Sequence, residues 1–400
     1  MKESILLSVI LFLSSLFLIF GANSISISAT EADLYFNGSG LIYCLSHFFT
    51  YFLGENDLAL RLPFIIFHIF SLFLIYKIGK LFLKRKLDRV LSTAIYALLP
   101  GINSAAVLVN SVSVVIFLTL LFVYLYMYGF IKLSYLILFV SLFVDNSFSV
   151  LYLSLFFYAV SRKDKRLLVY SLVLFGISMY MYGFDDGGKP KGYFVDTLGV
   201  YAAIFSPFLF LYYIYALYRI LIKEDKNLLW YISFIPFVLS LLLSIRQKVH
   251  IEDFAPFIVI GIPLMVRVFF NSYRVRLPVH RKLHRNFALF ILFFLLLSSF
   301  FSFVNKPLYP MFKNYKKHFA YRYHVVKELA HELEKKGIKK IKINDKKLSL
   351  RLKFYGIIDE NKNNNKVLFS SRRKGIGNLL HEIDIIYYGK KVGSFYIYGM

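Results

Sequence analysis

The sequence lacks most of the residues on which cysteine, metal and nucleotide chemistry depends. Its 400 residues include a single cysteine, Cys44, which excludes an intrachain disulfide and any multi-cysteine metal site. There is no phosphate-binding loop, no zinc-ligand spacing and no nucleophile elbow. His324 and His331 lie seven residues apart, with no third ligand near them in the sequence. The sequence therefore predicts no cofactor, and a divalent metal remains an open alternative.

Basic residues are absent from a long segment near the N-terminus. No Lys or Arg occurs from residue 22 to residue 60, whereas the acids of this segment include Glu31 and Asp33. The segment follows a strongly apolar run, so we expect an outer loop (22–61) at the membrane surface. A partly desolvated carboxylate there is suited to accept a proton. Solvated acids without a function are the plainer alternative.

Apolar residues, by contrast, are abundant. They make up 58% of the chain, aromatic residues alone make up 19%, and the mean hydropathy is +0.61. Because they gather in runs near the length of a spanning helix, the sequence predicts an all-α polytopic membrane domain over residues 1–305. We expect about eleven transmembrane helices, at 4–21, 62–83, 90–109, 111–128, 134–144, 148–160, 167–183, 198–221, 228–245, 254–270 and 286–304.

The distribution of Lys and Arg predicts the orientation. The formal net charge is +25, but many cations lie in short loops between apolar runs, where they set topology, so we expect no nucleic-acid partner. The richest loops, 84–89, 161–166 and 271–285, are predicted to be cytoplasmic. The N-terminus is then cytoplasmic, the first run is a retained helix of a plasma (inner) membrane protein, and the C-terminus faces outward.

Two parts of the predicted membrane domain depart from simple spanning helices. The runs 134–144 and 148–160 are each too short to cross about 30 Å of hydrocarbon upright. We expect them to form a helical hairpin that turns at 145–147. Pro100 and Gly101 interrupt the third run, either as a kink or as a turn between half-helices.

After Lys306 the composition becomes charged and globular, and it predicts a small α/β domain over 313–400 on the outer face. A helix is expected over 325–337, with Val326, Leu329, Ala330 and Leu333 on one face and Gly337 at its end. Segment 348–354 (LSLRLKF) fits a strand or a helix equally well. Strands are expected at 338–344, 366–371, 383–389 and 394–399, the last two joined by KKVG as a hairpin.

Cations on the outer side are candidate ligands for an anion, because positive residues are disfavoured there. They are Lys189 and Lys191 in DDGGKPKGYF, and Arg246, Lys248 and the neighbouring His250 in RQKVHIEDF. A lipid phosphate would suit them, although ordinary interfacial anchoring explains them equally well.

Arg61 opens the second apolar run in the sequence RLPF. It could contact a phosphate or an acid of the first outer loop. The alternative is a side chain that extends along apolar surface to the interface.

The order of these features resembles that of a known family. Between about residues 24 and 130 an acidic loop (TEADLYF), an amphipathic segment (LSHFFTYFLG), RLPF, a basic turn (LFLKRKLDR) and ALLPG follow one another. This order is similar to that of the dolichyl-phosphate-mannose protein mannosyltransferase and aminoarabinose transferase superfamily, whose membrane-embedded fold is called GT-C. The resemblance implies a GT-C-like fold.

The resemblance also implies site residues. The family's first outer loop begins with an Asp-Glu type motif; here Glu31 matches its Glu, Thr30 replaces its Asp, and Asp33 is close enough to substitute. A second acid is often present near the outer end of the third or fourth helix. Asn110 stands at the matching place, and its amide oxygen could bind a metal but could not act as a base.

The implied function is an inverting glycosyltransferase that moves a sugar from a polyprenyl-phosphate donor to an unknown acceptor on the outer face. Glu31 or Asp33 would be the base. The donor phosphate would be held by Arg61, Lys189, Lys191, Arg246, Lys248 and His250. Two alternatives stay open. An inactive GT-C-like scaffold or binding protein is favoured by the missing second acid, and a lipid or sugar transporter would place ionisable groups near mid-bilayer and show related halves.

Overall fold

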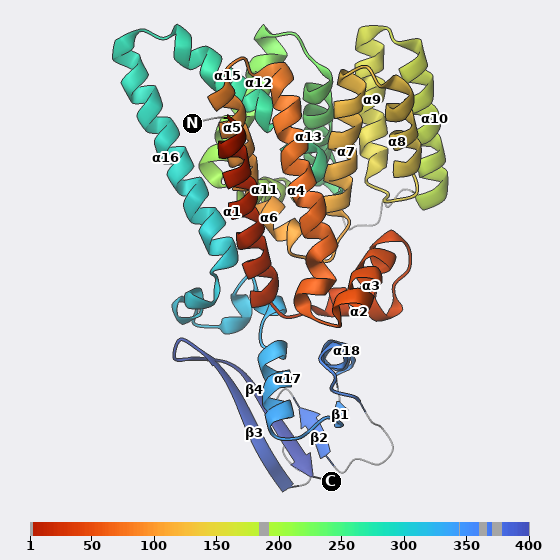
Figure 1. The fold of residues 1–400 in the computed structure, drawn as a ribbon, viewed down its shortest axis with the longest axis vertical. Helices are drawn as coiled ribbons and strands as arrows, with labels where there is room; N and C mark the ends of the chain where they lie inside the picture. Colours follow the sequence, from red (N-terminus) through yellow and green to blue (C-terminus); the bar gives the residue numbers. More distant parts are fainter. Residues whose placement is uncertain (1–2, 184–191, 344, 360–365, 370–377, 400) are drawn as a thin grey trace. The chain divides into compact units, whose positions relative to one another are not determined.

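The computed structural model describes residues 3–183, 192–343, 345–359, 366–369 and 378–399. The chain forms two compact units, and Figure 1 shows the elements of each. The first, which we call the helical unit, comprises residues 1–16, 64–106 and 110–300. The second, which we call the mixed unit, comprises 17–63, 107–109 and 301–400. Helices α1 (Glu3–Ser24) and α4 (Asp57–Phe82) contribute to both units.

The helical unit is built from helices alone among its described residues. After α1 and α4 these are α5 (Lys86–Ala97), α6 (Pro100–Ala106), α7 (Val112–Met127), α8 (Ile131–Ser141), α9 (Phe148–Arg162), α10 (Lys165–Tyr182), α11 (Phe194–Phe205), α12 (Pro207–Lys223), α13 (Leu228–Arg246), the 3-10 helix η1 (Ile251–Asp253), α14 (Ala255–Val259), α15 (Ile262–Val275) and α16 (Pro278–Phe303).

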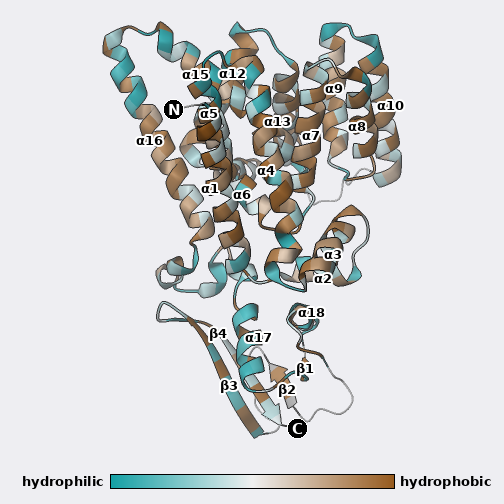
Figure 2. Ribbon diagram, viewed as in Figure 1, coloured by the Kyte–Doolittle hydropathy of each residue, from teal (hydrophilic) through white to brown (hydrophobic). Residues whose placement is uncertain are grey.

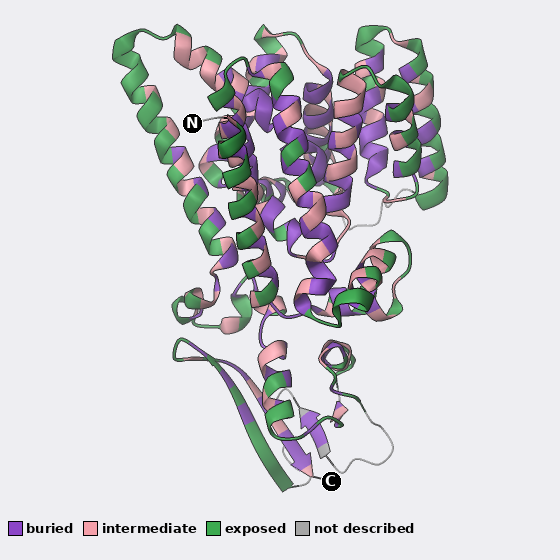
Figure 3. Ribbon diagram, in the orientation of Figure 1, coloured by how far each residue is buried: buried purple, intermediate pink, exposed green. Residues whose placement is uncertain are grey.

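In the part of the chain that the structure describes, five helical segments are long and apolar enough to cross a bilayer. They are α1, α4, α13, the stretch Ala255–Val275 and α16; the pair α11 and α12, bent by 104°, would be a sixth. The apolar surface of α16 is largely exposed along its length (Figures 2 and 3), which suits a helix that faces lipid. These features indicate a membrane protein.

The eleven predicted spans are not confirmed, because several apolar runs fold as short or broken helices. Leu98 and Leu99 separate α5 from α6, which begins at Pro100, so the turn between half-helices is the correct alternative. The run 198–221, predicted as one helix, breaks at Ser206, which adopts φ 74° before Pro207 starts α12. Helices α8 and α9 are separate, as predicted, and Asp145 Oδ1 accepts a hydrogen bond from the Ser147 amide in the turn between them (2.9 Å).

The mixed unit combines the first outer loop with the C-terminal residues. Its elements are α2 (Ala29–Asn37), α3 (Leu41–Leu53), three 3-10 turns (η2, Lys306–Met311; η3, Tyr315–Lys317; η4, Tyr321–Tyr323), α17 (Val326–Lys335), β1 (Lys342–Ile343), α18 (Lys346–Phe354), β2 (Lys366–Phe369), β3 (Asn378–Tyr387) and β4 (Lys390–Gly399). The sheet order is β1-β2-β4-β3, with β1 parallel to β2 and the other neighbours antiparallel.

Helix α17 matches its prediction closely. Val326, Leu329, Ala330 and Leu333 are all buried, and the chain leaves the helix through Gly337 at φ 67°. These side chains join a core with the inward residues of the sheet, among them Ile383, Ile385 and Phe395.

Three details of the C-terminal prediction need correction, and one open alternative is resolved. The strand expected over 338–344 shortens to β1. Segment 348–354, which fitted a strand or a helix equally well, is helical as part of α18. The hairpin is present, but its turn is Tyr388–Gly389, where both residues have positive φ, as a two-residue turn of this kind requires. The KKVG segment belongs to β4. The compact unit also extends beyond residues 313–400, because it includes 17–63.

Candidate functional site

The site is organised around the start of α2, which begins directly after the end of α1. Ser28 precedes the helix in extended conformation, and its Oγ accepts a hydrogen bond from the Glu31 amide (3.2 Å). Glu31 Oε2 in turn accepts a hydrogen bond from the Ser28 amide (2.8 Å). This reciprocal capping box satisfies two backbone donors and fixes where the helix starts.

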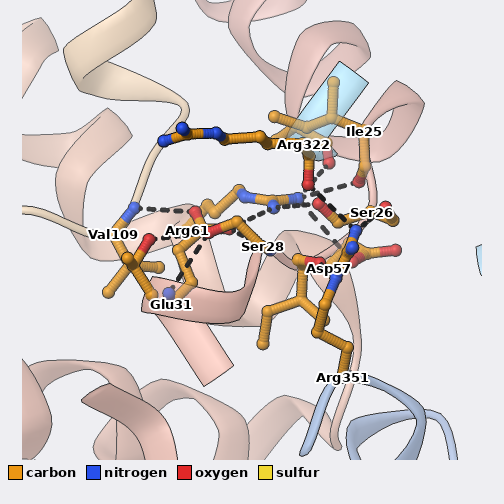
Figure 4. A network of polar contacts seen from close by, with 12 residues as sticks. Ile25, Ser26, Ser28, Glu31, Asp57, Arg61, Val109, Arg322 and Arg351 are labelled. Carbon is orange, nitrogen blue, oxygen red and sulfur yellow. Dashed lines mark hydrogen bonds and ion pairs between the residues drawn. The ribbon is translucent and has the colours of Figure 1, made fainter. Parts of the chain in front are cut away.

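Both carboxylate oxygens of Glu31 are occupied (Figure 4). Besides the Ser28 amide, Oε2 faces Arg61 Nη2 at 3.2 Å, and Oε1 accepts a hydrogen bond from the Val109 amide at 3.0 Å. The residue is 3% exposed. A carboxylate with this many donors and so little solvent contact holds its neighbours in place.

Arg61 is fully buried, and its guanidinium binds backbone carbonyl oxygens at the end of α1 and just after it. Nη1 donates to the carbonyl oxygens of Ala22 (2.8 Å) and Ile25 (3.0 Å), and Nη2 donates to that of Ser26 (3.1 Å) as well as to Glu31. Of the alternatives raised by the sequence, the structure shows contact with an acid of the first loop, and zero exposure excludes a side chain reaching the interface.

Asp57 adds a second buried acid to this cluster. It lies 3.6 Å from Arg61 Nη1, 2.8 Å from Lys327 Nζ, and accepts a hydrogen bond from the Tyr355 hydroxyl at 2.7 Å. Two acids, Glu31 and Asp57, therefore face two cations, Arg61 and Lys327. Such pairing is what a buried group of charges requires.

Two C-terminal residues bind the same loop. Arg351 belongs to α18, and Tyr355 lies in the turn directly after this helix. Arg351 Nε donates to the Ile27 carbonyl (2.7 Å), while Nη2 reaches the Ser26 hydroxyl and the Arg322 carbonyl. The Tyr355 hydroxyl accepts a hydrogen bond from the Ile27 amide (3.0 Å). Burial lowers the pKa of Arg351, and burial with the nearby Asp57 raises the pKa of Tyr355.

Asp33 has the opposite environment. It is exposed on α2, and its Oδ1 accepts a hydrogen bond from Asn37 Nδ2 (2.8 Å). Residues two positions apart in an α-helix differ by about 200° around its axis, so Glu31 and Asp33 project from different faces of α2. Thr30, which stands where the family has Asp, is exposed as well.

Helix α3 packs against α2 with one face and leaves an aromatic face open. Tyr35 stacks on His47 with ring centroids 4.2 Å apart, and its hydroxyl lies 3.1 Å from Thr50. His47 thus has a packing role in this pair. The opposite face exposes Phe48, Tyr51, Phe52 and Leu53, with Tyr51 85% exposed.

The predicted phosphate ligands separate into four groups. Lys248 and His250 line a cavity of about 260 Å³ in the helical unit, together with Asn146, Gln247 and Asp253 and apolar residues of α9, α10 and α13. Arg246 is exposed and is not among the residues that line this cavity, and Arg61 belongs to the buried cluster. Lys189 and Lys191 lie outside the described residues.

The residues considered for metal binding have other contacts. Asn110 Oδ1 accepts a hydrogen bond from the Val112 amide (3.0 Å) at the start of α7. His324 Nδ1 lies 2.8 Å from the buried Tyr309 hydroxyl, whereas His331 is exposed. Within the described ranges there is no group of three or more His, Cys, Asp or Glu side chains that could hold a metal ion.

Sequence reasoning identified Glu31, Asp33 and Arg61 but not Asp57, Lys327, Arg351 or Tyr355. Asp57 lies four residues before Arg61, a spacing that brings two side chains together on a helix and could have suggested the pair. The other three stand in a lysine-rich region without any distinctive spacing. Comparison with protein-family models and with curated proteins gives no match.

Proposed function

We propose that this protein is a GT-C-like membrane glycosyltransferase that uses a polyprenyl-phosphate sugar as donor. The observation that carries the proposal is the contrast between two acids of α2, the buried Glu31 and the exposed Asp33. A buried network fixes the start of α2 through Glu31 and Arg61, and the same helix exposes Asp33. An accessible carboxylate on a rigidly held helix directly after a candidate membrane helix is suited to remove a proton from an incoming nucleophile.

The two acids then have different roles. Asp33 takes the proton of the acceptor hydroxyl or amine as that group attacks the anomeric carbon, and the bond from this carbon to the phosphate oxygen breaks with inversion. Glu31 is a positioning residue, because its oxygens are already bonded to Ser28, Val109 and Arg61. Arg61 likewise positions the loop, since four of its donor contacts are made within the protein.

The donor's phosphate is expected at cationic residues of the helical unit. Lys248 and His250 lie at a cavity whose lining combines polar groups with apolar side chains such as Val150, Phe175 and Leu239. This combination suits an amphiphile with an anionic head. Arg246, Lys189 and Lys191 remain predicted contributors, and cations here would stabilise the charge that develops on the leaving phosphate.

A catalytically inactive binding protein is the second candidate. It is favoured by Asn110, whose amide stands where a second acid is expected and whose oxygen is engaged with the Val112 amide. Such a protein would keep the cavity at Lys248 and His250 and bind the donor without turning it over.

The test supplies a polyprenyl-phosphate sugar to the purified full chain in lipid and measures released polyprenyl phosphate. A general base typically contributes about 10² to 10⁴-fold to the rate. Asp33→Asn is therefore expected to lower turnover by at least about 100-fold with unchanged thermal stability. Asn37→Ala, which removes the hydrogen-bond partner of Asp33 and keeps the carboxylate, is the matched control and should retain most activity.

Glu31→Gln separates positioning from proton transfer. It is expected to lower the midpoint of thermal unfolding as well as turnover, because one partner of a buried ion pair is lost. Full activity in Asp33→Asn would refute the assignment of the base. Donor binding without turnover in the wild type would instead favour the inactive binding protein.

A further inference from the structure

We infer that a lysine-rich segment of the mixed unit, residues 334–347, binds a soluble linear anionic polymer. This segment (EKKGIKKIKINDKK) contains seven lysines and two acids, a formal net charge of +5. It covers the end of α17, crosses β1 and enters the first turn of α18. None of these residues is among those proposed for the donor site, Lys248 and His250.

Five of these seven lysines form no ion pair with the residues that the structure describes. Lys335 pairs with Glu332 at 2.8 Å. Five others, Lys336, Lys339, Lys342, Lys346 and Lys347, form no ion pair with any residue that the structure describes, and all but the half-exposed Lys342 are exposed. The acid Asp345 is engaged as the cap of α18, where it accepts a hydrogen bond from the Lys347 amide (2.9 Å). The positive charges are therefore left to solvent or to an external anion.

Two of the lysines stand where a helix disfavours them. Lys346 and Lys347 occupy the first turn of α18, at the positive end of the helix dipole. A cation near a helix N-terminus is unfavourable by about 0.3 to 1 kcal/mol, whereas an anion is favoured there. A bound anion would offset this local repulsion and would lie near the positive end of the helix dipole. Lys336 at the end of α17, by contrast, is explained by the dipole alone.

The chemistry of the segment favours a polyanion without bases, such as polyphosphate, over a nucleic acid or a bilayer. No aromatic residue occurs from 334 to 347, although stacking on aromatic side chains is how proteins commonly hold single-stranded nucleic acid. At the N-terminal end of α17, Lys327 contacts the Asn23 carbonyl at the end of α1 and the side chain of Asp57. Lys336 lies about 14 Å further along the helix axis, so the segment starts away from the end of that candidate membrane helix.

The test measures binding of fluorescent long-chain inorganic polyphosphate to the full chain in nanodiscs of zwitterionic lipid, at several salt concentrations. The variant is Lys346→Gln with Lys347→Gln. The matched control is Lys316→Gln with Lys317→Gln, an exposed lysine pair in η3 of the same unit. The wild type should bind, with log K falling linearly with log salt. The magnitude of that slope should be smaller by about 1.4 in the variant, at about 0.7 for each phosphate contact of a single strand that is removed.

We expect the variant to bind at least about tenfold more weakly while its unfolding temperature stays the same or rises, because a dipole repulsion is removed. The control should bind within about twofold of the wild type. Equal losses in both variants would overturn the proposal, since net charge alone would then explain binding. No binding by the wild type would also overturn it. So would tighter binding of an RNA oligomer, or of vesicles containing phosphatidylglycerol, than of polyphosphate at equal charge.

Discussion

At the scale of single residues, Arg61 joins parts of the chain that are distant in sequence. Its donors reach one carbonyl oxygen in the last turn of α1, two just after that helix, the acid that caps α2 and the acid that starts α4. Because the side chain is fully buried, each of these acceptors lacks water as a substitute partner. Loss of the guanidinium would leave Glu31 and Asp57 as buried charges with fewer partners.

We therefore predict that Arg61→Met destabilises the protein by about 3 to 5 kcal/mol, the range for removing one partner of a buried ion pair. Chemical denaturation of the purified protein in detergent measures the change. Adding Glu31→Gln to this variant should recover part of the loss, because the unpaired charge is then removed. A loss below about 1 kcal/mol in the single variant would show that the cluster is not a stabilising unit.

His324 gives a prediction on pH dependence. It is buried beside the Tyr309 hydroxyl, and burial together with the charge of Lys306 lowers its pKa from 6.5 to about 3. The folded protein thus keeps this imidazole neutral where the unfolded chain takes up a proton. Its contribution to stability is complete above pH 6.5 and decreases as the pH falls towards 3, by at most about 1.4 kcal/mol per pH unit.

His324→Gln should accordingly flatten the pH dependence of the unfolding free energy between pH 6.5 and 5. Glu328, whose pKa is lowered by Lys306 against the opposing effect of burial, titrates below this window. The difference between wild type and variant therefore reports on the histidine. Parallel curves for the two proteins would show that His324 is not held neutral.

At the scale of elements, α3 is a 13-residue helix with an exposed aromatic face between two candidate membrane helices. Exposed apolar patches on amphipathic helices of this kind suit the lipid interface. We predict that a tryptophan in place of Tyr51 is quenched by brominated lipids. The background is Trp230→Phe, which removes the only native tryptophan.

The control places the tryptophan at Tyr388, in the turn of the β3–β4 hairpin, where the side chain is 69% exposed. That position should show no quenching. Equal quenching at the two positions, or no quenching at either, would show that α3 is not the element of the mixed unit that contacts lipid.

Elements were predictable from the sequence where one periodic pattern dominates. Helix α17 has four apolar residues at helical spacing and a terminal glycine, and its buried face is the predicted one. Apart from tyrosines, Ser206 is the only polar residue from 198 to 218, so the break in the run 198–221 could not be found from hydropathy. There Pro207 was the available signal, since proline favours the first turn of a new helix.

At the scale of the whole molecule, the positive loops lead to a test of topology. We predict that a reporter at Lys163, in the turn between α9 and α10, and a reporter at Gly389, in the β3–β4 turn, lie on opposite sides of the membrane. A compartment-specific pair of fusions, such as an alkaline phosphatase and a fluorescent protein, gives opposite signals at the two sites. Matching signals would show that the number of spans between them is even.

The assignment of residues to units was less predictable than their secondary structure. Apolar run length correctly indicated the charged C-terminal region, but it could not show that residues 17–63 belong with that region. Their association depends on Arg351 and Tyr355, whose partners Ser26, Ile27 and Asp57 are about 300 residues away in the chain. Contacts at such separation leave no local pattern.

The same separation sets an order of events during synthesis. Arg61 meets Ala22, Ile25, Ser26 and Glu31 as soon as the first 61 residues have been inserted. Asp57, however, cannot bind Lys327 and Tyr355 until these residues have been synthesised, which happens after the residues of the helical unit. A chain truncated before residue 327 would retain a carboxylate without two of its three partners. A residue made 298 positions later thus completes the set of partners of Asp57.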